Sequence, residues 1–298
     1  MLKNTISITL IIFVFFLSCG KKKESTTNSN VESKITKPSL QLLWQTDTLL
    51  TTCESVLYDE VSKTIYVANI NNGPWEEDNN GFISTINTKG EITKLNWIQG
   101  LSAPKGMGIY NGKLYVNDIH NLVEIDIKNR KISNTFTVEN NPQLNDLTVS
   151  PDGVVYVSGS NSNKIHKLQN GNLSVYTSNP EGNRLNGLLW QEEGVYYADF
   201  AASVFGLVNN KDLNFKTLTK DIGQADGIVR LENGDFITSG WSGQLFYIYA
   251  KDFRAVELLD TREEKIYAAD IDYIPATQTL LVPTFFHNRV MAYKLKFE

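Results

Sequence analysis

The stretch LNDLTVSPDGVVYVSG (Leu144 to Gly159) decides the fold, because two similar stretches follow it at intervals of about forty residues. They are LNGLLWQEEGVYYADF (Leu185 to Phe200) and ADGIVRLENGDFITSG (Ala225 to Gly240). In each copy one polar residue stands eight positions before a turn glycine, and these residues are Asn145, Asn186 and Asp226. Two short apolar strands per unit at such a period are typical of the blades of a β-propeller, whose polar points converge on one axis.

The repeat extends over the chain as six units. Their inner strands start near Glu54, Lys105, Asn145, Asn186, Asp226 and Asp270, and each is followed by a turn and a second strand. The last unit runs out of chain before its outer strand, whereas Leu40 to Thr46 precedes the first blade without a blade of its own. We therefore predict an all-β fold for residues 40–298: a six-bladed β-propeller of four-stranded blades, closed by an N-terminal strand that joins the last blade.

The N-terminus has the pattern of a targeting segment. Lys3 and the apolar run Ile6 to Leu17 precede Leu17-Ser18-Cys19-Gly20, which is similar to a bacterial lipobox. We predict a lipoprotein signal peptide in residues 1–18, a lipid on Cys19 and a flexible tether in residues 19–39. An ordinary signal peptide or an uncleaved anchor are the alternatives. The predicted location is the bacterial cell envelope, as a lipid-anchored membrane protein on the periplasmic side or the cell surface.

Composition restricts the class of partner. The net charge is −5, and the body contains no run of Lys and Arg, which argues against nucleic acid and favours a small-molecule substrate. Cys53 is the only cysteine of the body, so no disulfide framework is expected and a buried thiol is favoured. A closed propeller has no spare edge, and we therefore predict a monomer that meets the membrane through its lipid anchor only.

The polar residues at the starts of the inner strands should surround one end of the central channel. Three carboxylates and two amides among six such residues form an oxygen-rich set, which suits a hard divalent cation such as Ca²⁺ or Mg²⁺. The alternative is that Asn and Asp only close turns with their side chains. Glutamate is a poor turn residue, so Glu54 favours the metal site.

The segments ESVLYD around Glu54, LNDLTVSPDG around Asn145, NGLLW around Asn186 and DGIVRLENG around Asp226 resemble the senescence marker protein/gluconolactonase family, which includes regucalcin and bacterial sugar lactonases. The resemblance implies Glu54, Asn186 and Asp226 as ligands of a divalent metal ion, with Ca²⁺ expected first and Mg²⁺, Mn²⁺ or Zn²⁺ as alternatives. It also implies Asn145 near the substrate and Asp226 as the catalytic base of lactone hydrolysis.

Other residues are predicted to contact the substrate, and two of them depart from the family. Gln143 stands where several members have an arginine that holds substrate hydroxyls, which argues against gluconolactone as the substrate. Lys105 would repel a metal at close range, but it could bind a carboxylate or a lactone oxygen. The alternative is a solvated lysine at the rim of the channel. The predicted substrate-binding residues are Asn145, Lys105, Gln143, Trp241 and His287, and the segment Asn69 to Gly81, which contains Trp75, is a candidate lid.

Two functions from different classes follow. The first is a metal-dependent lactonase or related hydrolase of carboxylic esters, anchored in the cell envelope. The alternative is a non-catalytic propeller that acts as a lipid-tethered binding or scaffold protein. The sequence contains no nucleophile elbow, phosphate loop, paired-cysteine zinc site or HExxH helix, which argues against the enzyme classes that depend on them.

Overall fold

Turn glycines separate the two inner strands of the third and fifth blades, as the sequence predicts. In the third copy of the inner hairpin, Gly153 has a φ of +84° and donates its N–H to the Ser150 carbonyl oxygen. Gly234 has a φ of +88° in the corresponding turn of the fifth. Such φ values strain residues that carry a Cβ atom, so glycine lets the chain reverse and pair with itself.

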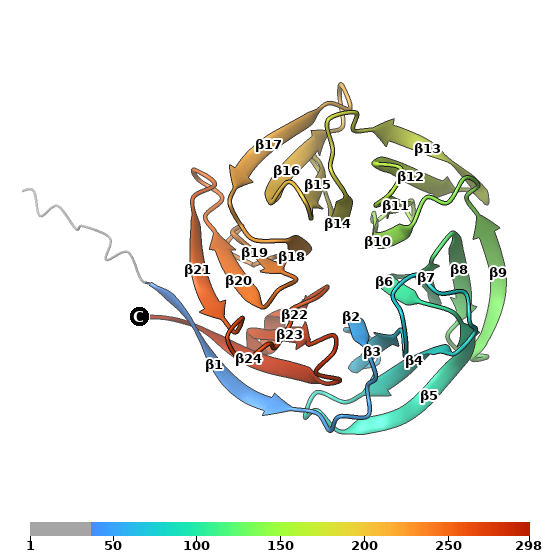
Figure 1. Ribbon diagram of the computed structural model, residues 1–298, viewed down its shortest axis with the longest axis horizontal. Helices are drawn as coiled ribbons and strands as arrows, with labels where there is room; N and C mark the ends of the chain where they lie inside the picture. The colour runs from blue at the N-terminus through green and yellow to red at the C-terminus, as the bar shows by residue number, and fades with distance from the viewer. Residues whose placement is uncertain (1–36) are drawn as a thin grey trace, which may run out of the picture. The chain divides into compact units, whose positions relative to one another are not determined.

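The computed structural model describes residues 37–298, which form six four-stranded antiparallel blades arranged as a ring (Figure 1). Five blades follow the chain from the axis outwards. The first comprises β2 (Cys53–Asp59), β3 (Thr64–Asn69), β4 (Gly81–Ile86) and β5 (Ile92–Leu101). The second comprises β6 (Pro104–Tyr110), β7 (Lys113–Asp118), β8 (Asn121–Asp126) and β9 (Lys131–Thr137). The third comprises β10 (Leu144–Val149), β11 (Val155–Gly159), β12 (Lys164–Gln169) and β13 (Asn172–Ser178).

The fourth blade comprises β14 (Leu185–Gln191), β15 (Gly194–Asp199), β16 (Val204–Asn209) and β17 (Phe215–Lys220). The fifth comprises β18 (Ala225–Arg230), β19 (Phe236–Gly240), β20 (Gln244–Ile248) and β21 (Ala255–Asp260). The sixth comprises β22 (Asp272–Ile274), β23 (Thr279–Pro283), β24 (Val290–Phe297) and β1 (Pro38–Gln45). The short 3-10 helix Pro275–Thr277 is the only helix among the described residues, as expected of an all-β fold.

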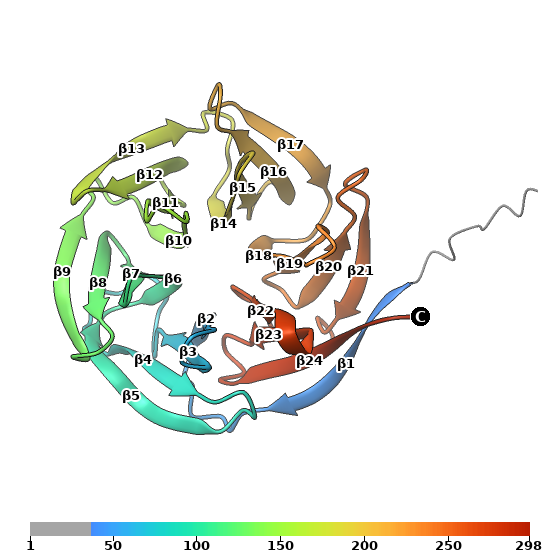
Figure 2. The same ribbon diagram turned by 180° about the vertical axis from the view of Figure 1, so that it is seen from behind.

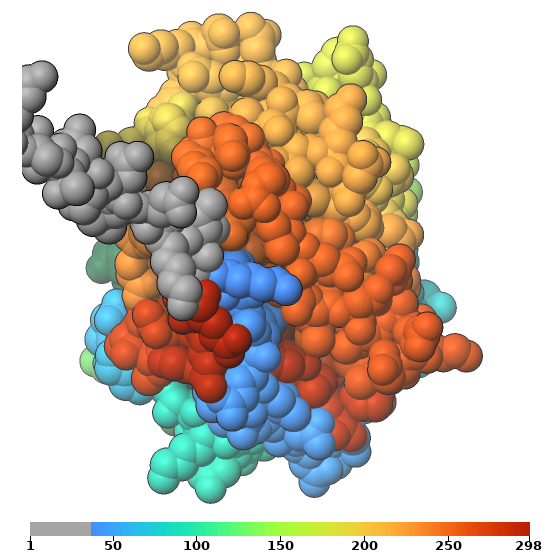
Figure 3. All heavy atoms as spheres, turned by 90° about the vertical axis from the view of Figure 1, so that its left-hand side faces the viewer, coloured from blue at the N-terminus to red at the C-terminus, as the bar shows by residue number. Residues whose placement is uncertain are grey.

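The sixth blade confirms the predicted closure of the ring. β1 pairs antiparallel with β24, with Leu40 opposite Leu295, and the view from behind shows the two strands side by side at the rim (Figure 2). Lys37 and Glu298 exchange backbone hydrogen bonds of 2.8 and 3.1 Å. In the side view β1, in blue, lies against the red atoms of the last strand (Figure 3). The strand begins at Pro38, two residues before the predicted start of the body.

The core lies between neighbouring blades, where apolar faces pack on each other. One cluster joins Ile237 and Leu245 of the fifth blade to Leu280 and Leu295 of the sixth, and all four are at most 1% exposed. Cys53 is also fully buried, as predicted, and burial raises the pKa of its thiol to about 12. The thiol is therefore protonated and inert at neutral pH.

The targeting segment lies outside the described part of the chain. The predicted signal peptide in residues 1–18, Cys19 and nearly all of the predicted tether precede residue 37. Within residues 37–298 no helix is long and apolar enough to cross a membrane.

Candidate functional site

Five of the predicted polar residues meet near the axis of the ring. They line one hollow of about 110 Å³, which we call the central hollow, and each is at most 7% exposed. We call them the ring residues: Glu54 on β2, Lys105 on β6, Asn145 on β10, Asn186 on β14 and Asp226 on β18. Side chains far apart in the sequence thus share one buried site.

A local irregularity at the start of the inner strands places the ring residues. On β10, Leu144 pairs with Gly159 but Leu147 pairs with Val157, so three steps along the inner strand match two along its neighbour. The pairing register shifts in the same way at the corresponding point of β6, β14 and β18. In β2 the register shifts by one residue between Cys53 and Ser55. A bulge of this kind turns a side chain out of the regular ladder, which here is the side chain of the ring residue.

The sixth inner strand has no such bulge, and the expectation that Asp270 joins the others is not met. Asp270 precedes β22 and pairs with Ser55 of β2 in an isolated parallel bridge. Its Oδ2 accepts a 2.6 Å hydrogen bond from the Ser55 hydroxyl. Asp270 therefore lines a second hollow of about 250 Å³, together with Asp146 and Asp272, rather than the central hollow.

Three buried oxygens of the ring residues have no hydrogen-bond partner. They are Oε2 of Glu54, Oδ1 of Asn186 and Oδ1 of Asp226, and they come from three different blades. Buried polar atoms are normally paired, so three unpaired oxygens in one hollow need an explanation. Carboxylate and amide oxygens are the donors that Ca²⁺ and Mg²⁺ prefer, and the residues fit such an ion.

The third donor of this set has to be an amide. Among residues 37–298 no group of three or more His, Cys, Asp or Glu side chains converges in a way that could hold a metal ion. The two carboxylates of the central hollow, Glu54 and Asp226, therefore need Asn186 to complete a three-oxygen set. Such a set has little affinity for a soft ion that prefers thiolate or imidazole ligands.

Burial makes both carboxylates reluctant to ionise. It raises the pKa of Glu54, and Lys105 partly offsets this. Burial raises the pKa of Asp226 well above its usual range, and the neighbouring charges of Glu54 and Asp270 raise it further. A cation between the two side chains would reverse these shifts, because it favours the charged form of each acid.

Lys105 is an unusual member of the ring because its ammonium is buried. Its Nζ lies 3.5 Å from Oε1 of Glu54 and 4.4 Å from the centre of the Trp75 ring. The side chain is only 2% exposed. Lys105 thus neutralises one oxygen of Glu54, while the other oxygen stays unpaired.

Aromatic side chains cover the polar floor. Trp75, Phe200, Trp241 and Phe285 line the hollow, and each lies in a connection that follows the second strand of its blade. The Trp241 ring is 5.4 Å from Phe285 and 6.1 Å from Phe200, centre to centre. Trp241, a predicted substrate contact, and Trp75 of the candidate lid thus both line the central hollow.

Two predicted substrate contacts lie elsewhere. Gln143 lines a neighbouring groove that contains His120 and Glu77, and this groove shares only Trp75 with the central hollow. His287 is not among the lining residues, and its backbone N–H closes a turn onto the Thr284 carbonyl oxygen. Both residues lie in connections next to inner or second strands, but neither lines the central hollow.

Arg184 lines the central hollow and was missed by sequence reasoning. It precedes Asn186 by two positions, as Gln143 precedes Asn145. The family pattern places an arginine at this offset in the third blade, so a search of the same offset in every blade would have found Arg184. The guanidinium comes from the fourth blade instead.

No protein-family model and no curated protein matches the chain. Solved structures do match. The calcium-binding protein regucalcin from Agrobacterium tumefaciens has a TM-score of 0.65 and 14% identity, covering 86% of this chain and 95% of that one. A protein described as a gluconolactonase has a TM-score of 0.64 and 12% identity, covering 88% and 93%. Virginiamycin B lyase from Staphylococcus aureus has a TM-score of 0.63 and 12% identity, covering 87% and 100%. The chain therefore shares the six-bladed propeller of the gluconolactonase and regucalcin group, which confirms the resemblance at the level of the fold.

Proposed function

We propose that the protein is a divalent-cation-dependent hydrolase of a lactone or a related cyclic ester, held in the cell envelope by a lipid on Cys19. The observation that carries the proposal is the set of three unpaired buried oxygens of Glu54, Asn186 and Asp226 in one hollow. Ca²⁺ is the first choice of ion because all three donors are oxygens. The names of two structural neighbours, a calcium-binding protein and a gluconolactonase, support the same assignment.

A bound divalent ion would polarise the ester carbonyl group and stabilise the negative charge that develops on its oxygen. Asp226 can hold the ion with Oδ1 and take a proton from the attacking water with its other oxygen. Asn145 is fixed beside it, because its Nδ2 donates to the Ser160 hydroxyl at 3.1 Å. The aromatic side chains Trp75, Phe200, Trp241 and Phe285 of the hollow would limit the access of water to a bound ligand.

The test uses the chain from residue 20 onwards, because all six blades lie within residues 38–297. The protein is stripped of metal and assayed against lactones and esters with Ca²⁺, Mg²⁺, Mn²⁺ or Zn²⁺. We expect turnover only with an ion, and a loss of at least about 100-fold in Asp226→Asn, as for removal of a general base. Asp212→Asn is the matched control, since the Asp212 carboxylate only accepts the exposed backbone N–H of Asn214. If no lactone or ester of the panel is hydrolysed with any of the ions, the proposal is overturned.

One observation favours the second candidate, a non-catalytic binding or scaffold propeller. The buried ammonium of Lys105 already balances Glu54, so the fold has an internal cation beside the donor set. Calcium-dependent melting separates the two candidates when it is combined with the lactone panel. A rise in melting temperature without turnover would favour the binding protein.

The anchor is a separate part of the proposal. Cys19 follows the apolar run at the position that lipoprotein processing requires. The full chain should partition with membranes, and Cys19→Ser should release it or leave it unprocessed. Equal distribution of the two chains between membrane and soluble fractions would contradict a lipid on Cys19.

A further inference from the structure

Arg184 presents a free cation at the central hollow. Its guanidinium lies 5.7 Å from the centre of the Trp75 ring and 5.9 Å from that of Phe200. No carboxylate among residues 37–298 lies within ion-pair distance of it. Lys105 differs, because its ammonium is bound to Glu54. Arg184 is therefore the cation that remains available to a ligand.

The backbone of Arg184 is held in a conformation that favours glycine. Its φ is +101°, although arginine carries a Cβ atom. The neighbours hold it there: the Arg184 N–H donates to Oδ1 of Asn163 at 2.9 Å, and its carbonyl oxygen accepts the Phe200 N–H at 3.0 Å. Strained backbone positions cluster at functional sites, and the two hydrogen bonds fix the backbone position from which the Arg184 side chain reaches the hollow.

The charges of the site favour an anion. Glu54 and Asp226 carry two negative charges when ionised, and Lys105 and Arg184 carry two positive charges, so the four side chains cancel. A divalent cation would then leave a net charge of about +2 in a largely buried hollow. A neutral ligand would leave this charge uncompensated, whereas an anionic ligand reduces it.

The hollow also limits the size of the ligand. Its volume of about 110 Å³ is far below the roughly 300–1,000 Å³ of pockets that take drug-sized molecules. A single small ring with short substituents is the size that fits, and the aromatic wall offers it flat surfaces. The planar fork of a guanidinium matches a carboxylate on such a ring with two parallel hydrogen bonds.

We propose that the substrate is a small monocyclic lactone that bears a carboxylate, and that Arg184 binds this carboxylate while the ring lies against the aromatic side chains that line the hollow. This rests on the proposed lactonase function. In the reaction, water adds to the ring carbonyl carbon and the ring C–O bond breaks. The alkoxide leaving group takes one proton, and a second is released, so the product is a hydroxy dicarboxylate.

Binding is tested with benzoate and its neutral analogue benzamide, by ligand-detected NMR titration of the calcium-loaded chain from residue 20 onwards. We expect benzoate to bind at least about tenfold more tightly than benzamide, as for a hydrogen bond to a charged group. Arg184→Gln should remove this preference, and Arg184→Lys should retain part of it. Arg254→Gln is the matched control, because Arg254 also lies over an aromatic ring, 4.3 Å from the centre of Tyr249, but outside the hollow.

Arg184→Gly separates a binding role from a structural one. Glycine relieves the strain at φ +101°, so the melting temperature should stay the same or rise while the preference for benzoate is lost. A clear fall in melting temperature would mean that Arg184 serves the fold. Equal affinity for benzoate and benzamide in the wild-type chain, or a preference that survives in Arg184→Gln, would overturn the carboxylate site.

Turnover distinguishes this inference from the proposed function. The substrates are 5-oxotetrahydrofuran-2-carboxylate and its carboxamide, and Arg184→Gln should raise KM for the acid about tenfold while leaving that for the amide unchanged. If neither lactone reacts but benzoate binds through Arg184, the hydrolase fails and the anion site stands. If both react equally in the wild-type and Arg184→Gln chains, the hydrolase stands and the inference fails.

Discussion

Lys105→Met tests the charge balance of the site most directly, because methionine keeps the apolar stem and removes the ammonium. The Nζ to Oε1 distance of 3.5 Å to Glu54 corresponds to an attraction of about 5 kcal/mol at an effective dielectric constant of about 20. Losing one partner of a buried pair costs roughly 3–5 kcal/mol. Glu54 can limit this cost by taking a proton, so we expect the ion-free variant to lose about 3 kcal/mol of unfolding free energy at pH 7.

A divalent ion should compensate for the missing ammonium. In urea titrations with Ca²⁺ the deficit should shrink to below about 1 kcal/mol, because the ion supplies the positive charge that Glu54 requires. The deficit should also be smaller at pH 5 than at pH 7 in the ion-free protein. Burial raises the pKa of Glu54, so the native state keeps a proton that the unfolded chain releases, and stability falls as pH rises.

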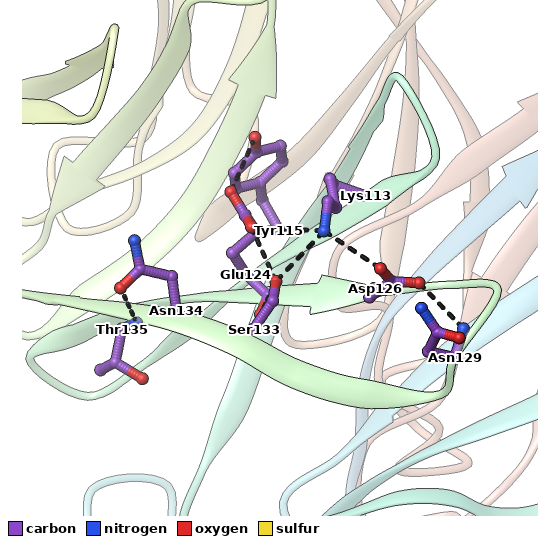
Figure 4. Close-up of polar contacts among 8 residues, drawn as sticks. All are labelled: Lys113, Tyr115, Glu124, Asp126, Asn129, Ser133, Asn134 and Thr135. Atoms are coloured by element: carbon purple, nitrogen blue, oxygen red, sulfur yellow. Dashed lines mark hydrogen bonds and ion pairs between the residues drawn. The ribbon is translucent and has the colours of Figure 1, made fainter.

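Lys113→Met is the matched control on the same blade. Lys113 lies on β7 with its Nζ 3.3 Å from Asp126 and 3.7 Å from Glu124, and its side chain is partly exposed. Figure 4 shows Lys113 among these polar contacts. Water screens such pairs, so its removal should change the unfolding free energy much less. Our reasoning fails if ion-free Lys105→Met loses less than about 1 kcal/mol, or if calcium leaves its deficit unchanged.

Two further predictions concern the inner strands. A Cβ atom at Gly187 would overlap the carbonyl oxygen of Asp226, so Gly187→Ala should push β14 from β18 and reduce the calcium-induced rise in melting temperature. In Gly240→Ala the methyl group would lie 3.3 Å from the nearest atom, so this control variant should keep the calcium-induced rise in melting temperature. Burial raises the pKa of Asp272 to about 6, so the native state keeps a proton that the unfolded chain has released. The free energy of unfolding should therefore fall as pH rises from about 4 to about 6. Urea titrations at several pH values should show a flatter pH dependence for Asp272→Asn.

The fold was predictable because each blade repeats the same local pattern. The turn glycines Gly153 and Gly234 have the positive φ values that their places in the repeat require. The missing outer strand of the last unit identified the segment that became β1, since an open edge in an otherwise closed ring needs a partner. Only the ends of strands shifted, because they depend on pairing with distant segments rather than on local sequence.

The residues of the site could be predicted where the repeat is regular, and the prediction failed where the repeat is irregular. Asn145, Asn186 and Asp226 share a bulge, so equal spacing in the sequence became equal placement in space. Asp270 has similar spacing, but its segment pairs with Ser55 of the first blade and carries its carboxylate to the second hollow. Arg184 stands two positions before Asn186, but the same position is Gln143 in the third blade and Gln224 in the fifth, so the repeat alone did not single out an arginine there.

The hydrogen bonds of the buried carboxylates separate those that tie strands together from those that keep an unpaired oxygen. Asp146 accepts backbone N–H groups from Leu147 and Leu188 with its two oxygens, which ties β10 to β14. Asp272 accepts those of Tyr58 and Tyr273 in the same way and ties β22 to β2.

Glu54 and Asp226 are equally buried, but each keeps an oxygen without a donor. Backbone N–H groups satisfy both oxygens of the neighbouring buried carboxylate of Asp146. An unpaired buried oxygen costs stability, and the proposed cation would supply the positive charge that two carboxylates and one amide of the same hollow lack.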